Sequence, residues 1–198
     1  IELSHKTFGD VELRLGYGWL QEEGSFLGSE SDGAFGVESS GDSQFVTASI
    51  LAPITDDVSL FGSYTRGEAS VSTGGTSLLS DWSTAKVESF GAGMIAKDVA
   101  MESDRLTLMA GQPLRVEEAS ATLTVPTGRT ADGRVVNESE RVDLAPEARE
   151  IALEAIYSFD VNDDGDNLAM GTFVRLNPDH DPNADPDAGI GIRYRMSW

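Results

Sequence analysis

The stretch that decides the fold is residues 190–198, which read IGIRYRMSW. Counted back from Trp198, every second side chain is apolar or aromatic, and the intervening side chains are arginine, serine or only a glycine hydrogen. Successive side chains of a β-strand point to opposite faces, so this alternation predicts a strand with one apolar and one polar face.

The same two-residue period recurs along the chain. It is clear in residues 11–19 (VELRLGYGW), 151–159 (IALEAIYSF) and 168–176 (LAMGTFVRL), and weaker in residues 45–54, 58–69, 86–99, 105–116, 120–125 and 134–144. We therefore expect about ten strands, most of them longer than the five to six residues usual in soluble sheets. Roughly 9–11 residues is the length that a tilted strand needs to cross a bilayer.

Short and long connections mostly alternate between these segments. The short ones are acidic turns at residues 55–57, 102–104 and 162–166, and an Asp-Gly hairpin signal lies in residues 127–133. The long ones are residues 21–43, 72–85 and 177–188. Short connections expected near Pro113 and Pro146 interrupt the rule, and Pro113 within a strand pattern indicates an edge, a bulge or a strand end. Tight turns at one end and long loops at the other are typical of outer-membrane barrels.

The composition excludes several classes of protein. The 198 residues include 34 acidic and 14 basic residues, for a net charge of -20, which argues against nucleic acid as a partner. The absence of cysteine excludes disulfides and thiol chemistry. No apolar run approaches the roughly 20 residues of a membrane helix. We identify no cofactor-binding motif and no catalytic motif, and therefore expect neither a cofactor nor an enzyme.

These patterns together predict an all-β fold, an antiparallel transmembrane β-barrel that occupies residues 1–198 as a single domain, with residues 1–10 as a lead-in segment. An arginine facing lipid at mid-depth costs about 2–4 kcal/mol, so the charged side chains of the strands should face the lumen. These lumen-facing residues are Glu12, Arg14, Glu154, Arg175, Arg193 and Arg195. They would line a hydrated pore, grip a threaded segment, or simply pair to fill a small barrel.

Aromatic residues gather toward the strand ends and predict two belts at the membrane interfaces. The belt residues are Tyr17, Trp19, Tyr157 and Phe159. Ordinary packing in a protein core explains any single one of these rings equally well. A soluble sandwich that ends on an amphipathic strand is the corresponding alternative for residues 190–198.

Two acidic stretches raise the question of calcium. Asp160, Asn162 and Asp164 match the opening of a calcium loop, but Gly171 stands where the bidentate glutamate belongs, so an acidic hairpin turn is the preferred interpretation. His180 lies in a second acidic stretch, residues 179–187, which we expect to be a mobile, solvated loop. A catalytic triad through His180 is the least favoured hypothesis.

The last strand resembles the C-terminal signal by which the barrel assembly machinery recognises outer-membrane proteins. Its signal residues are Ile190, Ile192, Tyr194, Met196 and Trp198. Further stretches resemble the C-terminal translocator domain of autotransporters whose passengers are subtilisin-family serine proteases. They are residues 22–29 (EEGSFLGS), 33–36 (GAFG), 112–116 (QPLRV), 125–134 (VPTGRTADGR), 141–146 (RVDLAP) and 189–195 (GIGIRYR).

The resemblance implies a barrel in the bacterial outer membrane that anchors an N-terminal passenger and supports its export, with outer-membrane lipids as its surroundings. Such domains usually have twelve strands and a helix in the lumen, so ten strands mean either a smaller barrel or the C-terminal part of a twelve-strand barrel. In the second case the chain would pair with its own N-terminal part or with another chain. A structural or pore-forming barrel without a passenger, and a soluble acidic β-barrel binding module, are the alternatives.

Overall fold

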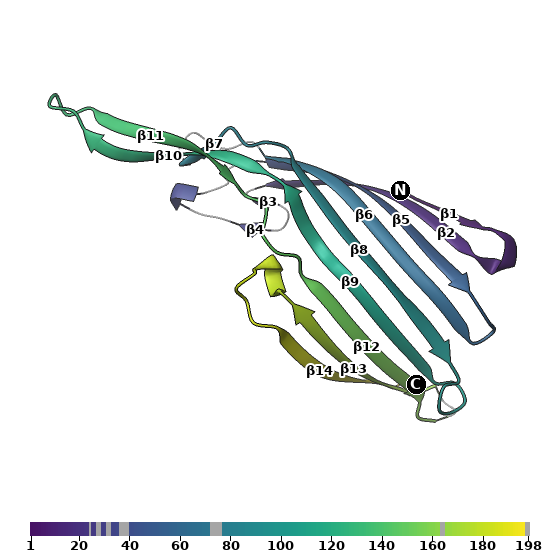
Figure 1. Cartoon of the computed structure of the whole chain (residues 1–198). Coiled ribbons are helices and arrows are strands. Elements are labelled where there is room, and N and C mark those ends of the chain that lie inside the picture. The colour runs from purple at the N-terminus through teal and green to yellow at the C-terminus, as the bar shows by residue number, and fades with distance from the viewer. Residues whose placement is uncertain are drawn as a thin grey trace.

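The structure is a computed structural model that describes residues 1–23, 25–26, 29–30, 33–35, 40–71, 77–162 and 165–196 (Figure 1). Nine strands form one antiparallel sheet in the order β1-β2-β5-β6-β8-β9-β12-β13-β14. Their bounds are β1 Glu2–Lys6, β2 Glu12–Glu23, β5 Ser40–Pro53, β6 Val58–Val71, β8 Ala85–Lys97, β9 Arg105–Glu118, β12 Ile151–Asp160, β13 Asn167–Leu176 and β14 Asp187–Arg195.

Smaller elements complete the described part of the chain. Strands β10 (Ser120–Arg129), β11 (Val135–Asp143) and β7 (Leu79–Ser80) form a second sheet, and β3 (Ser25–Phe26) pairs with β4 (Ser29–Glu30). Three short 3-10 turns are η1 (Phe8–Asp10), η2 (Gly33–Phe35) and η3 (Pro178–His180). Among the described residues, no helix is long and apolar enough to cross a membrane.

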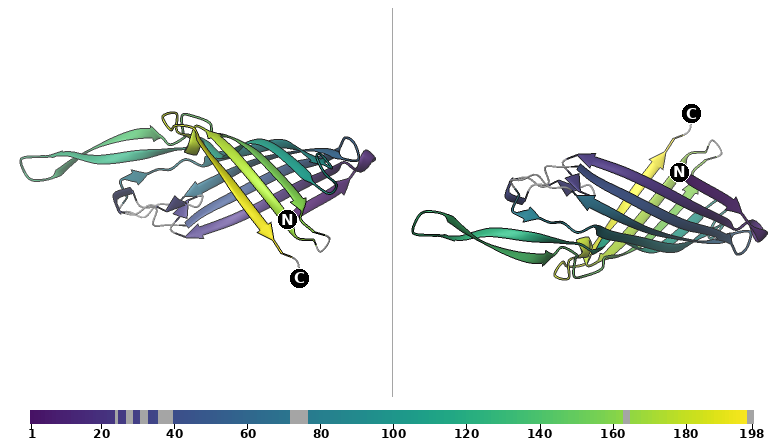
Figure 2. Two further views of the ribbon diagram at one scale, coloured as in Figure 1. Left: turned by 90° about the horizontal axis from the view of Figure 1, so that it is seen from below. Right: turned by 90° about the horizontal axis from the view of Figure 1, so that it is seen from above.

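All ten segments with two-residue alternation are strands, which confirms the all-β, antiparallel prediction. Two details differ. The expected lead-in segment contains β1, which pairs with β2 from Glu2↔Gly16 to Lys6↔Glu12. Strands β10 and β11 leave the main sheet and form a hairpin that projects beyond it (Figure 1 and Figure 2). Alternation identifies a strand but not the sheet it joins, and this is why the main sheet has nine strands rather than ten.

This hairpin removes the irregularity in the connections. Strand β9 continues through Pro113, which lies at a shift in the β8–β9 register between Glu88 and Phe90, so no turn occurs there. The hairpin of residues 119–150 is instead the long connection from β9 to β12. Its distant tip is the turn between β10 and β11 at residues 130–134, where the Asp-Gly hairpin signal lies. Short connections (residues 7–11, 54–57, 98–104 and 161–166) then alternate strictly with long ones (24–39, 72–84, 119–150 and 177–186). We call the two edges of the sheet the short-turn end and the long-connection end.

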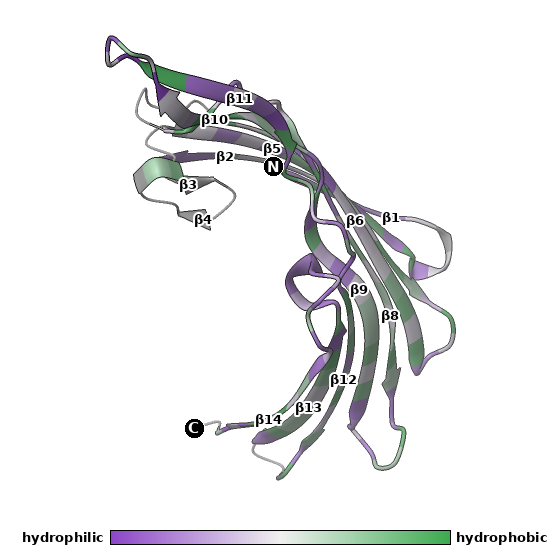
Figure 3. Ribbon diagram, turned by 60° about the vertical axis from the view of Figure 1, so that its left-hand side comes forward, coloured by the Kyte–Doolittle hydropathy of each residue, from purple (hydrophilic) through white to green (hydrophobic). Residues whose placement is uncertain are grey.

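The main sheet is strongly curved, with β1, β2 and β5 on one limb and β12 to β14 on the other (Figure 3). A barrel formed by this chain would close by pairing residues 11–19, or an earlier strand, with residues 190–198, and no such pairing occurs among the described residues. Strand β2 pairs with β1 and β5, and β14 pairs with β13. The coarser prediction of an antiparallel all-β fold therefore holds, and the sheet is open.

The strands are staggered relative to one another. The cross-strand row through Leu13, one residue from the short-turn end of β2, reaches Ala188, seven residues from that end of β14. With a strand spacing of about 4.8 Å and a rise of about 3.3 Å per residue, this stagger corresponds to a tilt of roughly 30°. Strands of closed barrels tilt by about 35–45°, so the sheet has nearly the stagger that a barrel requires.

The buried core is very small. Its central cluster is Ala69, Ala85 and Ala119, packed against Val116 and Leu144 at the root of the β10–β11 hairpin. The accessible surface is 12932 Å², whereas a soluble monomer of 21.1 kDa exposes about 9,000 Å². The sheet is thus a single layer whose two faces are both largely uncovered.

Candidate functional site

The strand register sorts the side chains of the main sheet into two faces of different character. Directly paired residues of neighbouring strands lie on the same face of a sheet. One such row consists of Leu13, Ile50, Gly62, Ala92, Ala110, Leu153, Val174 and Ala188. The neighbouring row on the other face consists of Glu12, Leu51, Phe61, Gly93, Met109, Glu154, Phe173 and Gly189. We call these two faces the apolar face and the mixed face.

The apolar face carries an uncharged band across all nine strands. Besides the row above, the band contains residues that lie on the same side by register: Leu3, His5, Leu15, Tyr17, Val46, Ala48, Ala52, Val58, Leu60, Tyr64, Phe90, Met94, Ala96, Leu106, Leu108, Ala155, Tyr157, Leu168, Met170, Thr172, Ile190, Ile192 and Tyr194. None of these described positions holds Asp, Glu, Lys or Arg. Many of the large apolar side chains are exposed, up to 88% for Ile190. Contiguous exposed apolar surface on this scale marks an interaction surface.

All four tyrosines of the chain lie at the borders of this band. Toward the long-connection end, the Tyr17 hydroxyl donates to Gln44 Oε1 at 3.2 Å and the Tyr64 hydroxyl donates to Glu88 Oε2 at 2.8 Å. Rings with an apolar body and a hydrogen-bonded tip are suited to a boundary between an apolar and an aqueous phase. The same face becomes charged within the row of Tyr17 itself, where Arg66 pairs with Val46 and with Glu88.

The border at the short-turn end repeats a single arrangement. The Tyr157 hydroxyl donates to Asp104 Oδ2 at 2.5 Å, and the Tyr194 hydroxyl donates to Asp166 Oδ2 at 2.6 Å. Each aspartate immediately precedes a strand, and each tyrosine pairs with the residue two positions after that aspartate. Neither contact was predicted from the sequence, although a carboxylate directly before a strand is a signal that can be searched for.

The predicted belt residues lie at both borders of the apolar face. Tyr17 and the exposed Trp19 are near the long-connection end, and Tyr157 and Phe159, whose ring centroids are 5.9 Å apart, are near the short-turn end. Tyr64 and Phe90 belong to the same pattern but were not predicted. The alternation of β6 is weak because Phe61 places an aromatic ring on the opposite face, while Gly62 leaves the apolar face without a side chain.

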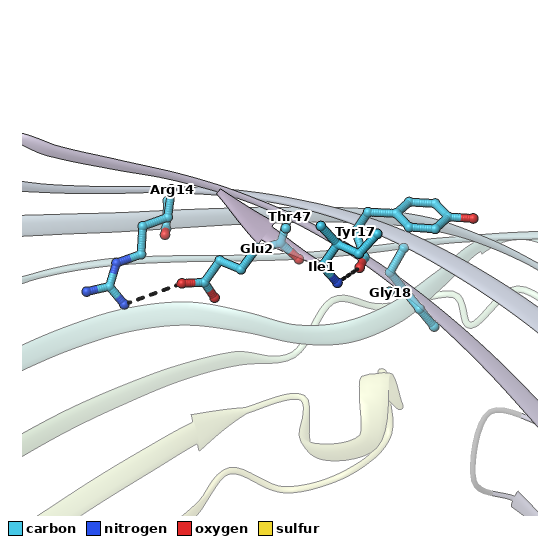
Figure 4. Close-up of a pocket in the computed structure, with 9 residues that line it drawn as sticks. Ile1, Glu2, Arg14, Tyr17, Gly18 and Thr47 are labelled. Carbon is cyan, nitrogen blue, oxygen red and sulfur yellow. Dashed lines mark hydrogen bonds and ion pairs between the residues drawn. The ribbon is translucent and has the colours of Figure 1, made fainter. Parts of the chain in front are cut away.

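All six residues predicted to face a lumen lie on the mixed face. Glu12 accepts from Arg14 Nε at 2.7 Å, and Arg14 Nη1 lies 4.0 Å from Glu2 Oε1. In Figure 4, Glu2 and Arg14 extend from their strands toward the side on which the C-terminal strands lie, the inside of the curve. They border a hollow of about 390 Å³ that Phe45 and Thr47 also line.

The residues of the predicted assembly signal lie on the exposed edge strand. Ile190 and Ile192 are 88% and 74% exposed, and Tyr194 and Met196 are also exposed. Arg193 and Arg195 point to the opposite face, as the alternation predicts. Trp198 lies outside the described residues.

The weak calcium candidates serve to close a turn. Asp160 Oδ1 accepts from Asn167 Nδ2 at 3.1 Å, and the Asn162 side chain makes two 3.0 Å hydrogen bonds with Asp166. Asp164 lies outside the described residues. Within the described part of the chain, no group of three or more His, Cys, Asp or Glu side chains is placed to hold a metal ion.

His180 is buried, so the expectation of a solvated position is wrong for this residue, although most of residues 179–187 around it are exposed. Its Nδ1 accepts from the Glu150 backbone N–H at 2.8 Å, and its Nε2 lies 3.1 Å from the Leu114 carbonyl oxygen. These partners fix the neutral tautomer with the proton on Nε2. Both ring nitrogens are occupied by the backbone, so His180 is built to hold residues 177–186 against β9 and β12. The residues that it contacts are distant in sequence, and no local pattern reveals them.

Replacing His180 with alanine should loosen this connection. The change leaves the N–H of the buried Glu150 without its partner, at a cost of about 1–3 kcal/mol, and removes the contact with the Leu114 carbonyl. We expect faster proteolysis within residues 177–186, measured by limited digestion and mass spectrometry. His5→Ala, at an exposed position, is the control. Equal protection of His180→Ala and the unaltered chain would contradict the role of His180.

Acid should weaken the turn of residues 98–104 through Asp104. Burial alone raises the pKa of Asp104, but hydrogen bonds from the Tyr157 hydroxyl and from three backbone N–H groups of residues 99–101 outweigh it and lower the pKa from 3.8 to about 2. A folded-state pKa below the unfolded value contributes stability above about pH 4 that is lost as the pH falls toward 2. Urea unfolding between pH 5 and 2 should show a smaller loss for Asp104→Asn than for the exposed Glu102→Gln control.

Comparisons with known proteins identify no relative: the chain matches no family model, no curated protein and no solved structure.

Proposed function

We propose that the chain is a membrane-spanning β-domain of the bacterial outer membrane, the translocator and anchor of an autotransporter. The observation that carries this proposal is the uncharged band, which crosses every strand of the main sheet and is bordered at both ends by hydrogen-bonded tyrosines. An apolar zone flanked by aromatic girdles is the pattern expected of a sheet in lipid.

The connections and the mixed face also agree with a sheet that spans the outer membrane. In outer-membrane barrels the tight turns face the periplasm and the long loops face outward, so the β10–β11 hairpin would stand outside the cell. The mixed face would line the lumen, where Glu12, Arg14 and Arg175 provide charge in an aqueous setting. The role is mechanical: the domain holds a passenger at the surface, and the barrel assembly machinery would insert it.

The membrane part of the proposal is tested by expressing the chain in a Gram-negative host. We expect it in the outer-membrane fraction after an alkaline wash, and bound to phospholipid vesicles in a flotation assay. A chain that stays monomeric in water without detergent would overturn the proposal and favour a soluble acidic binding module.

The autotransporter part requires a separate test, because a pore-forming or structural barrel without a passenger would have the same apolar band. The resemblance in residues 112–116, 125–134 and 141–146 favours the autotransporter. We expect the gene to encode a large domain before residue 1, and that domain to reach the cell surface only when this chain is present. An upstream region without such a domain would leave the barrel without a passenger.

A further inference from the structure

The main sheet has two edges without a partner strand among the described residues. Strand β14 pairs with β13, and β1 pairs with β2, whereas each of the other seven strands has neighbours on both sides. In the hydrocarbon of a membrane each unpaired backbone N–H or C=O costs several kcal/mol. If the apolar face lies in lipid, as proposed above, both edges must be covered.

The direction of the edge strands restricts what can cover them. Strand β2 follows a short connection and runs toward the long-connection end, so its antiparallel neighbour β1 runs toward the short-turn end. Strand β14 follows the long connection of residues 177–186 and also runs toward the short-turn end. The two edges therefore run in the same direction, as the first and ninth strands of an antiparallel sheet must. Direct pairing of β1 with β14 would be parallel, unlike every other pair in the sheet.

A second copy of the chain does not solve the problem. Copies inserted into a membrane in the same orientation present edges that again run toward the short-turn end. Any contact between the β1 and β14 edges of two such copies would be parallel as well. An antiparallel ladder requires an edge that runs from the short-turn end to the long-connection end.

We propose that β1 and β14 are joined by an amphipathic β-segment with an odd number of strands. The two outer strands of this segment run toward the long-connection end, and the apolar side chains at alternate positions continue the band past Ile190 and Ile192, the band's most exposed large side chains next to the joining edge. An odd number added to nine gives the even strand count of an antiparallel barrel. This inference rests on the proposed function, because only lipid makes the open edges intolerable.

The chain supplies a probe for this geometry. Residues 11–71 contain β2, β5 and β6, and both outer strands of this three-strand unit run toward the long-connection end. Placed before Ile1 through a short flexible linker, it gives twelve strands and brings a second copy of β2 to the free edge of β14. Residues 11–53 contain only β2 and β5, so the same fusion with this unit gives eleven strands and the wrong direction at the junction with β1.

Both fusions and the unaltered chain are refolded into phospholipid vesicles and tested for heat-dependent migration in SDS gels and for protease protection. We expect the three-strand fusion alone to give a compact, heat-sensitive, protected monomer. Equal closure of the two-strand fusion, closure of the unaltered chain alone or as a dimer, or failure of the three-strand fusion to close would each overturn the inference. The proposed function fails separately, if the unaltered chain does not associate with membranes at all.

Discussion

Replacing Leu108 with arginine should strongly reduce the fraction of the protein that folds into lipid. Leu108 is the middle one of the three apolar-band residues on β9, between Leu106 and Ala110, and its neighbours in the cross-strand row are Met94 and Ala155. An arginine facing lipid near the midplane costs about 2–4 kcal/mol, which corresponds to a roughly 30- to 1000-fold change in the folding equilibrium. The measurement is urea unfolding of the three-strand fusion described above, refolded into phospholipid vesicles with and without the substitution, with protease protection as a second readout.

The adjacent residue provides a matched control. Met109 is 37% exposed and Leu108 is 38% exposed, yet Met109 lies on the mixed face, where its paired neighbour on β12 is Glu154. An arginine at position 109 stays in the aqueous region near a carboxylate, and we expect it to cost less than about 1 kcal/mol. If both faces of the sheet were in water, the two arginine substitutions would have similar effects on stability. Similar losses of stability for both variants would therefore contradict a lipid-facing band.

The strands could be predicted from the sequence because their signal is local. A two-residue period needs only the order of side chains within about nine positions, and it located all ten predicted segments and the face of the six charged residues expected in the lumen. It also placed Arg193 and Arg195 opposite Ile192 and Tyr194, as the register has them.

The arrangement of these strands could not be obtained in the same way. Residues 120–125 and 134–144 alternate as the main-sheet strands do, but they form the projecting hairpin, because Ala119 and Leu144 pack at the rim and direct the chain away. Whether a strand enters a sheet depends on such distant contacts. Strand β1 was not predicted as a strand, because its alternation covers only five residues and gives a weak local signal.

The polar contacts could not be predicted either, because their partners are far apart in the sequence. Tyr157 and Asp104 are 53 positions apart, and His180 and Leu114 are 66 apart. Neither pair has a motif, so His180 was expected to be solvated. The aromatic belts were partly predictable, because position near a strand end is a local property, whereas the hydroxyl partners that fix each ring are not.

The second large effect is expected from Gly93, where three strands meet on the mixed face. Gly93 of β8 lies between Phe61 of β6 and Met109 of β9. A methyl group on Gly93 would lie 2.5 Å from Cζ of the Phe61 ring and closer still to the carbonyl oxygen of Leu108. The ring can turn, but the carbonyl belongs to the ladder and cannot withdraw without breaking it. We expect Gly93→Ala to destabilise the sheet by about 1–3 kcal/mol, the usual cost of overpacking.

Two comparisons make the Gly93 prediction specific to this geometry. At Gly191 of β14, on the same face, an added methyl group meets no atom within 4 Å, so Gly191→Ala should be close to neutral in the same urea titration. At Gly189 the three nearest atoms all belong to the Phe173 ring, so Phe173→Leu should relieve Gly189→Ala. Phe61→Leu should relieve Gly93→Ala only in part, because the Leu108 carbonyl remains. Full relief by Phe61→Leu would mean that the ring, and not the close approach of β8 to β9, requires glycine at position 93.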